Sequence, residues 1–362
     1  MKKGRSAVLV KPGQLETWEI PVTSPEPGGV LVKLTLGGVC GSDVHLLHGT
    51  AGVLPFPIVL GHEGVGVIEE LGEGVHTDYA SQPLKVGDYV YWSPVSACNS
   101  CFTCTVLGET PCEHASFFEE AGKPNWGAYS EHVWLPKGLA FYKLPEGASP
   151  EAVVALGCAL PTALRGVDQA GGIKIEDTVV IQGAGPVGLS SVLVAKEAGA
   201  REIIVIDVPG PRMDAAVALG ATRTVSLKDL TAAERKQAVY DITGPAGPRM
   251  VIEAAGVLNA FPEGFDLAGM HGTYLILGLW GTEGTVPVSP RDFTIKNLRV
   301  VGATFPKPEH YYKAMMLACR VASKVPLAEL VTHRFGVTQA AEALAAVESG
   351  RVVKAVIDPT LD

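Results

Sequence analysis

The sequence predicts an α/β protein with two domains, one of them built on a doubly wound parallel sheet. Three observations point to this class. The chain has 362 residues, and a single hydrophobic core rarely organises more than about 300. From Ala7 to about Val154, short apolar runs alternate with glycine and proline, as in a domain of strands and turns. From about Glu176, apolar strand, glycine-rich turn and alanine-rich helix repeat, as in βαβ units.

The composition argues against several classes of protein. Apolar residues make up 47% of the chain and charged residues 19%, which favours a folded protein over a disordered one. The formal net charge of −9 argues against a nucleic-acid partner, which needs a clustered basic surface. The start MKKGRSAVLV holds only four consecutive apolar residues, too few for a signal peptide, and no run approaches the roughly 20 needed to span a membrane. We therefore expect a cytoplasmic protein without membrane contact, whose thiols are reduced.

The first domain is expected to contain strands at Val30–Leu36 and Val65–Ile68, where apolar residues form short runs. The second domain begins with a strand at Thr178–Gln182, and strands and helices alternate from there. The next expected segments are the helix Leu189–Ala198, the strand Glu202–Val208, the helix Arg212–Leu219, and the strands Met250–Ala254, Tyr274–Leu277 and Leu298–Val301.

The tail after Pro306 and Pro308 changes pattern once more. Periodicity alone leaves open whether this tail extends the parallel sheet or folds back onto the first domain. Its expected helix, strand, helix and strand lie, in that order, at Tyr311–Ala322, Val331–Phe335, Gln339–Glu348 and Val353–Ile357.

A candidate dinucleotide-binding turn lies between the first strand and the first helix of the second domain. In VVIQGAGPVGL, Gly183, Gly185 and Gly188 form the pattern G-x-G-x-x-G, with Pro186 and Val187 inside it. The first glycine makes a tight turn, the second lets a pyrophosphate approach the backbone, and the third allows close packing of helix against strand. The N-terminus of the helix then offers unpaired N–H groups to the phosphates.

Asp207 ends the next strand, 19 residues after Gly188. A carboxylate at this place accepts hydrogen bonds from the adenosine ribose and repels a 2′-phosphate, so NAD is favoured over NADP. Arg212 follows closely and weakens this preference unless it faces solvent. A glycine-rich turn without a ligand is the plainer alternative, but the flanking strands and Asp207 argue against it.

The densest group of cysteines is CNSCFTCTVLGETPC. Its four thiols, Cys98, Cys101, Cys104 and Cys112, have the spacing C-x2-C-x2-C-x7-C. Four thiolates on one short loop close a tetrahedral zinc shell and leave no position for water or substrate. The sequence therefore predicts a structural zinc at this loop and catalysis elsewhere.

Other residues with metal-ligand or acid–base chemistry are scattered along the chain. Taken singly, each has a plainer interpretation, because a buried cysteine is usually a small apolar residue and a histidine near a turn usually lies at the surface. They are Cys40, Ser42, Asp43, His45 and His48 in GGVCGSDVHLLHG, His62 and Glu63 in LGHEGVG, and Cys158 in ALGCALPTALRG.

Taken in order, these motifs resemble those of the zinc-dependent alcohol dehydrogenases of the medium-chain dehydrogenase/reductase superfamily. The order is C-G-S-D-x-H, G-H-E-x-x-G, C-x2-C-x2-C-x7-C, G-C-x3-T, and G-x-G-x-x-G followed by an Asp. The match covers nearly the whole chain. It is specific for the family and says nothing of the substrate.

The resemblance implies an open catalytic metal site. Cys40, His62 and Cys158 would hold a second zinc and leave a fourth position for water or the substrate oxygen. Asp43 matches the carboxylate that orients the histidine ligand, and Glu63 matches an acidic neighbour that approaches the metal in some members. Solvated carboxylates are the plain alternative for both.

Ser42 and His45 match a proton relay of the family. Ser42 corresponds to the residue that bonds the alcohol, and His45 to the histidine at the far end of the relay, with a structural histidine as the alternative. An alkoxide must form before hydride leaves carbon, so the proton needs such a path. His48 has no counterpart and is expected to be a loop residue.

The resemblance also implies contacts with the cofactor. Lys354 would lie near the pyrophosphate, with a surface lysine as the alternative. Gly41 departs from the family, since some members have a basic residue there, and the long segment Glu73–Lys85 either alters the rim of the cleft or lengthens a surface loop. The expected contacts of the nicotinamide ring and its amide are Thr162, Val187, Leu277, Gly278, Leu279 and Phe305.

Members of this family fold as a glycine-rich, β-barrel-like (GroES-like) catalytic domain and a Rossmann domain, with the active site in the cleft between them. The resemblance implies the catalytic domain at residues 1–160, with a zinc lobe at 95–115, and the Rossmann NAD-binding domain at 161–305. The segment 306–362 would return to the catalytic domain. A homodimer or homotetramer is also implied.

The sequence thus predicts a zinc-requiring, NAD-dependent oxidation of an alcohol to a ketone or aldehyde. Cys158 argues against a polyol or amino-acid-alcohol dehydrogenase, because those relatives often have a carboxylate near this position. A protein that binds NAD and structural zinc without catalysing a reaction is an alternative of another class. Aromatic and apolar pocket candidates favour a bulky or cyclic secondary alcohol, although core packing explains the same residues equally well. These candidates are Phe56, Trp126, Leu279, Trp280 and Phe305.

Overall fold

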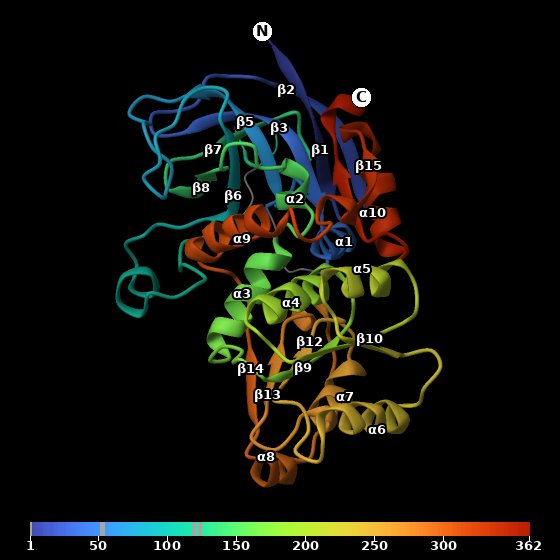
Figure 1. Ribbon diagram of the computed structural model, residues 1–362. Coiled ribbons are helices and arrows are strands. Elements are labelled where there is room, and N and C mark those ends of the chain that lie inside the picture. The colour runs from blue at the N-terminus through green and yellow to red at the C-terminus, as the bar shows by residue number, and fades with distance from the viewer. Residues whose placement is uncertain (1, 51–54, 118–120, 122–124) are drawn as a thin grey trace. The chain divides into compact units, whose positions relative to one another are not determined.

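The chain of the computed structural model divides into two units, Met1–Cys158 together with Lys307–Asp362, and Ala159–Pro306 (Figure 1). The structure describes residues 2–50, 55–117, 121 and 125–362, apart from the side chain of Trp280. The sequence placed the two boundaries after residues 160 and 305. No helix in the described ranges is long and apolar enough to cross a membrane.

The first unit contains two sheets. The smaller has the order β2-β1-β4, and the larger, seven-stranded one has the order β15-β16-β3-β5-β6-β8, with β7 also pairing with β3. The strands are β1 (Lys3–Lys11), β2 (Gln14–Pro21), β3 (Val30–Val39), β4 (Ile58–Val59), β5 (Gly64–Leu71), β6 (Tyr89–Ser96), β7 (His132–Leu135), β8 (Leu139–Lys143), β15 (Val331–Phe335) and β16 (Lys354–Ile357).

The C-terminal tail belongs to this first unit, which periodicity had left open. Strand β16 pairs antiparallel with β3, with Ala355 opposite Val39 and Ile357 opposite Gly37. Strand β15 then adds to β16 in parallel. The tail therefore supplies the last two strands at one end of the larger sheet.

Helix α1 (Gly41–His48) brings several candidate residues to one place. It begins after Cys40, whose backbone N–H donates to Asp43 Oδ2 at 3.0 Å, and it ends at Gly49 in the left-handed conformation, with φ 71°. The other helical segments of the unit are α2 (Pro150–Val154), α9 (Pro308–Val321), α10 (Ala340–Glu348), a π-helical turn at Thr103–Leu107, and 3-10 turns at Ala328–Leu330, Val337–Gln339 and Pro359–Leu361.

The second unit holds a parallel sheet of six strands, β9 (Thr178–Gln182), β10 (Glu202–Asp207), β11 (Arg223–Ser226), β12 (Met250–Glu253), β13 (Thr273–Ile276) and β14 (Arg299–Gly302). Their order in space is β11-β10-β9-β12-β13-β14. The chain runs outward from β9 to β11 and then returns to the other side of β9. This reversal confirms the predicted doubly wound sheet, in which a ligand binds beyond the carboxyl ends of the strands at the reversal.

Helices cover both faces of this sheet (Figure 1). Helices α3, α4 and α5 are neighbours on one face, and α6 and α7 on the other. Besides a 3-10 turn at Leu279–Gly281, the helices of this unit are α3 (Ala159–Gln169), α4 (Pro186–Glu197), α5 (Pro211–Leu219), α6 (Ala232–Thr243), α7 (Ala260–Leu267) and α8 (Pro290–Lys296).

The long segment Glu73–Lys85 folds around one buried carboxylate. Asp78 is 6% exposed. Its Oδ1 accepts from the N–H groups of Ala80 and Gln82, both at 2.8 Å, and its Oδ2 accepts from the N–H of Lys143 in β8, also at 2.8 Å. The Asp78 side chain therefore both orders the segment and anchors it to β8, where the Tyr79 N–H also donates to the Phe141 carbonyl at 3.1 Å.

We predict that Asp78→Ala destabilises the protein, because three backbone N–H groups lose their acceptor. The free energy of unfolding should fall by roughly 2 kcal/mol, measured by urea unfolding. Asp229→Ala is the matched control, since Asp229 is exposed and bonds Ser226 in the other unit. A loss below about 0.5 kcal/mol in Asp78→Ala would contradict the anchoring role.

Candidate functional site

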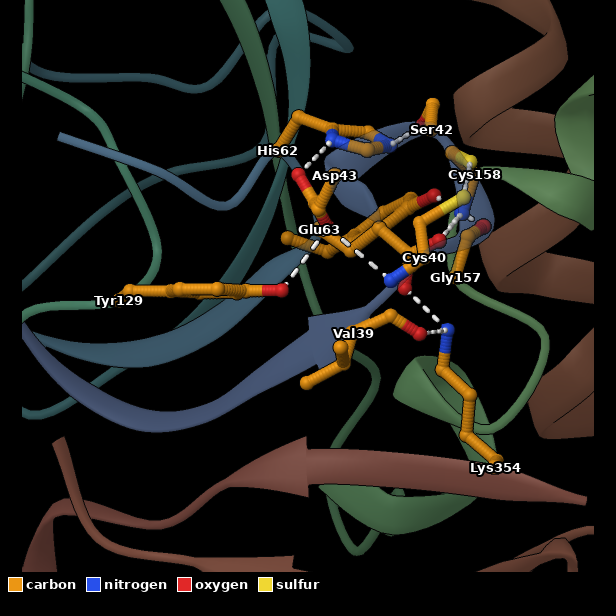
Figure 2. A network of polar contacts seen from close by, with 11 residues as sticks. Val39, Cys40, Ser42, Asp43, His62, Glu63, Tyr129, Gly157, Cys158 and Lys354 are labelled. Atoms are coloured by element: carbon orange, nitrogen blue, oxygen red, sulfur yellow. Dashed lines mark hydrogen bonds and ion pairs between the residues drawn. The ribbon is translucent and has the colours of Figure 1, made fainter. Parts of the chain in front are cut away.

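Three segments that are far apart in the sequence bring four ligand groups together in the first unit (Figure 2). Cys40 precedes α1, His62 and Glu63 precede β5, and Cys158 follows α2. One ligand atom of each residue lies within 4.8 Å of those of the others. The Sγ atoms of Cys40 and Cys158 are 3.7 Å apart. The three residues expected as catalytic zinc ligands therefore meet, with Glu63 beside them.

Asp43 fixes the orientation of His62. It is completely buried, and its Oδ1 lies 3.0 Å from His62 Nδ1. Its Oδ2 accepts from the Tyr129 hydroxyl at 2.9 Å, in addition to the Cys40 N–H (Figure 2). Because the carboxylate accepts from Nδ1–H, Nε2 is left with a lone pair for a metal. Burial opposes a charge on His62, but Asp43 raises the pKa of His62 well above its usual value.

The two thiols of this cluster differ in acidity. Hydrogen bonding to Cys158, assisted by His62, lowers the pKa of Cys40 well below its usual value, although burial opposes this. The same contact, together with burial, raises the pKa of Cys158. Two adjacent thiolates repel each other in a buried site, and a divalent cation removes this repulsion. Two sulfurs and an imidazole are a donor set that suits Zn²⁺.

Lys354 lies in this cluster rather than at a cofactor phosphate. It is 2% exposed, and its Nζ forms an ion pair with Glu63 and donates to the carbonyl of Val39 at 3.3 Å (Figure 2). An ammonium buried with these partners is not available to a pyrophosphate. The contact expected from the sequence is therefore wrong for Lys354.

Two glycines make room for the Glu63 carboxylate. A Cβ at Gly38 would lie 1.9 Å from Glu63 Oε2, and a Cβ at Gly157 would lie 2.1 Å from it. Glu63 Oε1 accepts from the backbone N–H of Cys158 at 3.0 Å. Burial opposes the charge on Glu63, but Lys354, assisted by His62, lowers the pKa of Glu63 to about 2. Glu63 is therefore ionised and joins the Cys158 loop to the C-terminal tail.

The four cysteines of the loop Cys98–Cys112 form a second cluster, also with their sulfurs within 4.8 Å of one another. Cys112 Sγ lies 3.4 Å from Cys98 Sγ and 3.8 Å from Cys101 Sγ. The backbone N–H groups of Ser100 and Cys101 donate to Cys98 Sγ and lower the pKa of Cys98 to about 6. Four converging sulfurs, with Cys104 as the fourth, fit a closed tetrahedral zinc site.

The two expected relay residues lie on α1. Ser42 Oγ is 3.3 Å from His62 Nε2, one of the ligand atoms of the first cluster. His45 Nδ1 is 3.1 Å from Thr50 Oγ1. No hydrogen bond joins Ser42 to His45 directly within the described residues. His48 instead contacts Glu348 of α10, with His48 Nε2 2.9 Å from Glu348 Oε1.

In the second unit, the glycine-rich turn has the geometry that its sequence requires. Gly183 has φ 95°, and a Cβ at Gly188 would lie 1.9 Å from the Gly183 carbonyl oxygen, so neither position tolerates a side chain. Gly185 precedes α4, and Pro186 is the first residue of that helix. A Cβ at Gly185 would meet no atom within 4 Å. The N-terminus of α4 is therefore open to a ligand.

Asp207 is bound to the same turn. Its Oδ2 accepts from the Ala184 N–H at 2.5 Å, and its Oδ1 from the Val208 N–H at 2.6 Å. Arg212 is half-buried in the first turn of α5. Burial lowers the pKa of Arg212, while the charge of Asp207 raises it. The pair thus lies where the ribose of a dinucleotide would be expected.

The remaining expected cofactor residues are spread over the second unit. Thr162 lies on α3 and Val187 on α4, while Leu277, Gly278 and Leu279 follow β13. Phe305 has a positive φ of 48°, just before the end of the unit. The side chain of Trp280, a pocket candidate, lies outside the described residues.

Two residues at these sites had no expected role. Tyr129 donates to Asp43, and Glu253 accepts three backbone N–H groups in the second unit. Both are completely buried. A carboxylate at the end of an apolar strand, as in MVIEAAG, is a signal for Glu253, whereas nothing local distinguishes Tyr129 from a core residue.

Comparison with known proteins agrees with this geometry. Residues 26–146 match the alcohol dehydrogenase GroES-like domain, and residues 186–320 match the zinc-binding dehydrogenases. A 5-exo-hydroxycamphor dehydrogenase from Pseudomonas putida is 57% identical over 361 residues and covers 100% of both chains.

Solved structures of dehydrogenases share this fold. An alcohol dehydrogenase from Thermotoga maritima is 30% identical, with a TM-score of 0.92 over 99% of this chain and 100% of its own. A zinc-binding dehydrogenase from Sinorhizobium meliloti, solved with NADP, is 27% identical, with a TM-score of 0.86 over 99% and 100% of the two chains. The predicted combination of a GroES-like domain with a Rossmann domain is confirmed. The chain therefore belongs to the zinc-dependent alcohol dehydrogenases of the medium-chain dehydrogenase/reductase superfamily.

Proposed function

We propose that this dehydrogenase oxidises a bulky, cyclic secondary alcohol to its ketone and transfers the hydride to NAD. The observation that carries the reaction type is the cluster of Cys40, His62 and Cys158, with His62 held by Asp43. The substrate class is supported by the relative with 57% identity, which is named for hydroxycamphor, a bulky cyclic alcohol.

Two zinc ions per chain are part of this proposal. Cys40, His62 and Cys158 would hold the catalytic ion, which supplies Lewis acidity that lowers the pKa of the substrate hydroxyl. Lys354 pairs with Glu63 and so leaves three protein ligands, rather than four, for that ion. The structural ion would be held by Cys98, Cys101, Cys104 and Cys112.

Ser42 and His45 would handle the proton of the alcohol. The Ser42 hydroxyl, 3.3 Å from His62 Nε2, is close enough to the ligand cluster to accept a hydrogen bond from the substrate hydroxyl. His45 lies one turn further along α1, where Thr50 bonds its Nδ1. His45 would receive the proton that Ser42 accepts and release it to solvent.

The preference for NAD rests on Asp207. Its carboxylate is held by the N–H groups of Ala184 and Val208, so a 2′-phosphate beside it would meet a fixed negative charge. The Sinorhizobium meliloti dehydrogenase was solved with NADP, so the fold by itself does not exclude NADP. Arg212 weakens the repulsion, and the preference is therefore expected to be moderate. Bound NAD would accept the hydride.

A panel of alcohols assayed with NAD and NADP tests the proposed reaction. We expect kcat/KM for hydroxycamphor or isoborneol to exceed that for sorbitol at least about 100-fold, and NAD to exceed NADP about tenfold. Formation of reduced cofactor is the measurement. Preferred oxidation of sorbitol would favour a polyol dehydrogenase instead. No turnover of any alcohol by protein with two bound zinc ions would favour the catalytically silent alternative.

Elemental analysis tests the two metal sites. We expect about two zinc ions per chain in the purified protein, and about one in either Cys158→Ser or Cys104→Ser, since each variant removes one thiolate from a different cluster. Cys158→Ser should also lose activity. Cys319→Ser is the matched control, because Cys319 lies in neither cluster. A single zinc that is lost only in Cys104→Ser would contradict a catalytic metal.

The Glu63–Lys354 pair gives a stability prediction. Lys354→Met leaves a buried carboxylate unpaired and should lower the free energy of unfolding by about 3–5 kcal/mol, whereas adding Glu63→Gln should restore most of it. Urea unfolding measures both. Lys236→Met is the matched control, because its partner Asp266 is exposed. An equal loss in the single and the double variant would contradict the pairing.

The same pair predicts a pH dependence. The pKa of Glu63 falls from 4.5 to about 2 on folding, so its contribution to stability is full above about pH 4.5 and is lost as the pH falls towards 2. The stability of the wild type relative to the double variant, which lacks the titrating carboxylate, should therefore fall between pH 5 and pH 2 or so. A relative stability of the wild type and the double variant that stays constant over this range would contradict the lowered pKa of Glu63.

A further inference from the structure

Glu253 is a buried carboxylate that the proposed reaction does not use. It is the last residue of β12 and is completely buried. In the sheet it lies opposite Gln182 of β9 and Ile276 of β13, at the carboxyl ends of the three strands. Among the residues that the structure describes, no Lys, Arg or His forms an ion pair with it. Its charge is therefore balanced by hydrogen bonds alone.

Those hydrogen bonds come from the backbone of two loops. Glu253 Oε1 accepts from the N–H groups of Ala255 and Gly256 at 2.8 and 2.7 Å, and Oε2 accepts from the N–H of Gly278 at 3.1 Å. Both oxygens thus accept from N–H donors, as an ionised carboxylate does. Burial raises the pKa of Glu253, while the three N–H groups work against this rise.

The loops joined by Glu253 pack closely, and they leave no room for a side chain at Gly278 or at Gly183 of the adjoining turn. A Cβ at Gly278 would lie 2.6 Å from the Gly256 nitrogen and 2.9 Å from Glu253 Oε2. A Cβ at Gly183, in the dinucleotide turn, would lie 2.8 Å from Ala255 Cα. The carboxylate therefore fixes the loops after β12 and β13, and the first of these packs against the glycine-rich turn after β9.

We propose that Glu253 is a positioning residue for the dinucleotide: it holds the Gly278 loop for the nicotinamide, and its negative charge favours the oxidised ring over the reduced one. The proposal rests on the proposed function, since it assumes a dinucleotide at this edge of the sheet. Ligands of doubly wound sheets bind beyond the carboxyl ends of the strands, where Glu253 lies.

The preference for the oxidised ring follows from charge. The oxidised nicotinamide carries a positive charge, and the reduced ring is neutral. A buried carboxylate that lacks a cationic partner attracts a positive ring through a region of low dielectric constant, where charges interact over longer distances than in water. The charge of Glu253 should not change the affinity for the adenosine half of the cofactor, which Asp207 would contact.

Binding measurements on the full-length protein test the proposal. The ligands are NAD⁺, NADH and ADP-ribose, which lacks the nicotinamide, and the variants are Glu253→Gln and Glu253→Asp. Glu202→Gln is the matched control. Glu202 is the first residue of β10, at the amino ends of the strands of the same sheet, and it bonds Thr222. Dissociation constants are measured by calorimetry and by the fluorescence of NADH.

We expect Glu253→Gln to weaken NAD⁺ binding about tenfold and NADH binding no more than about threefold, with ADP-ribose binding within about twofold of the wild type. Glu253→Asp keeps the charge, and it should keep the ratio of the two affinities. A merely structural role would change NAD⁺ and NADH binding equally.

Equal changes for NAD⁺ and NADH, or none, with ADP-ribose still bound, would overturn the proposal. If Glu253→Gln also loses ADP-ribose because it does not fold, a second neutral variant, Glu253→Ala, decides: an NAD⁺ affinity that falls more than the NADH affinity supports the proposal, and an unchanged ratio of the two affinities overturns it. A wild-type protein that binds none of NAD(H), NADP(H) and ADP-ribose would instead overturn the proposed function itself.

Discussion

The first unit is organised around a buried ion pair between residues 291 positions apart in the sequence, Glu63 and Lys354. Each is almost completely buried, and either charge alone would cost several kcal/mol in that environment. Gly38 and Gly157 leave the space that the carboxylate occupies. The N-terminal strands, the loop of Cys158 and the C-terminal tail must therefore be assembled together, and the tail is an integral part of the cluster that Cys40, His62 and Cys158 form.

Single carboxylates anchor loops throughout the chain. Asp43, Asp78 and Glu253 each accept three hydrogen bonds, most of them from backbone N–H groups, and each is almost fully buried. Irregular segments expose many backbone donors, and these need acceptors when they are taken out of water. An acidic side chain that satisfies several donors at once fixes a loop in one conformation. Such contacts hold the ligand-bearing segments where regular secondary structure ends.

Features that depend on local pattern could be predicted from the sequence. Strands β9 and β15 have the predicted bounds, whereas α4 and α9 begin three residues earlier than predicted. Both helices start at a proline, a residue that suits the first position of a helix. The prediction began each helix at an apolar residue after the proline, Leu189 or Tyr311, and therefore began it too late. Helix α6 escaped prediction because only Arg235 and Val239 are buried, so its apolar stripe is weak.

The partner of Lys354 could not be predicted, since nothing near it in the chain indicates Glu63. The one local signal is a lysine inside the apolar run VVKAVI, which marks a buried cation without naming its partner. The two clusters of potential metal ligands differ in the same way. The sulfurs of the loop Cys98–Cys112 are close in sequence, so their spacing alone predicts a closed site, and the Glu109–Lys307 ion pair fastens this loop to the returning tail.

Cys40, His62 and Cys158 meet only when the unit has folded, and their spacing predicts nothing by itself. Packing therefore decides both which groups reach this cluster and which are held back from it. Glu63 lies close enough to act as a fourth ligand, but its two oxygens already accept from Lys354 and from the Cys158 backbone. Under the proposed function, an open coordination position would thus be a property of the whole unit, set by a lysine that no metal motif contains.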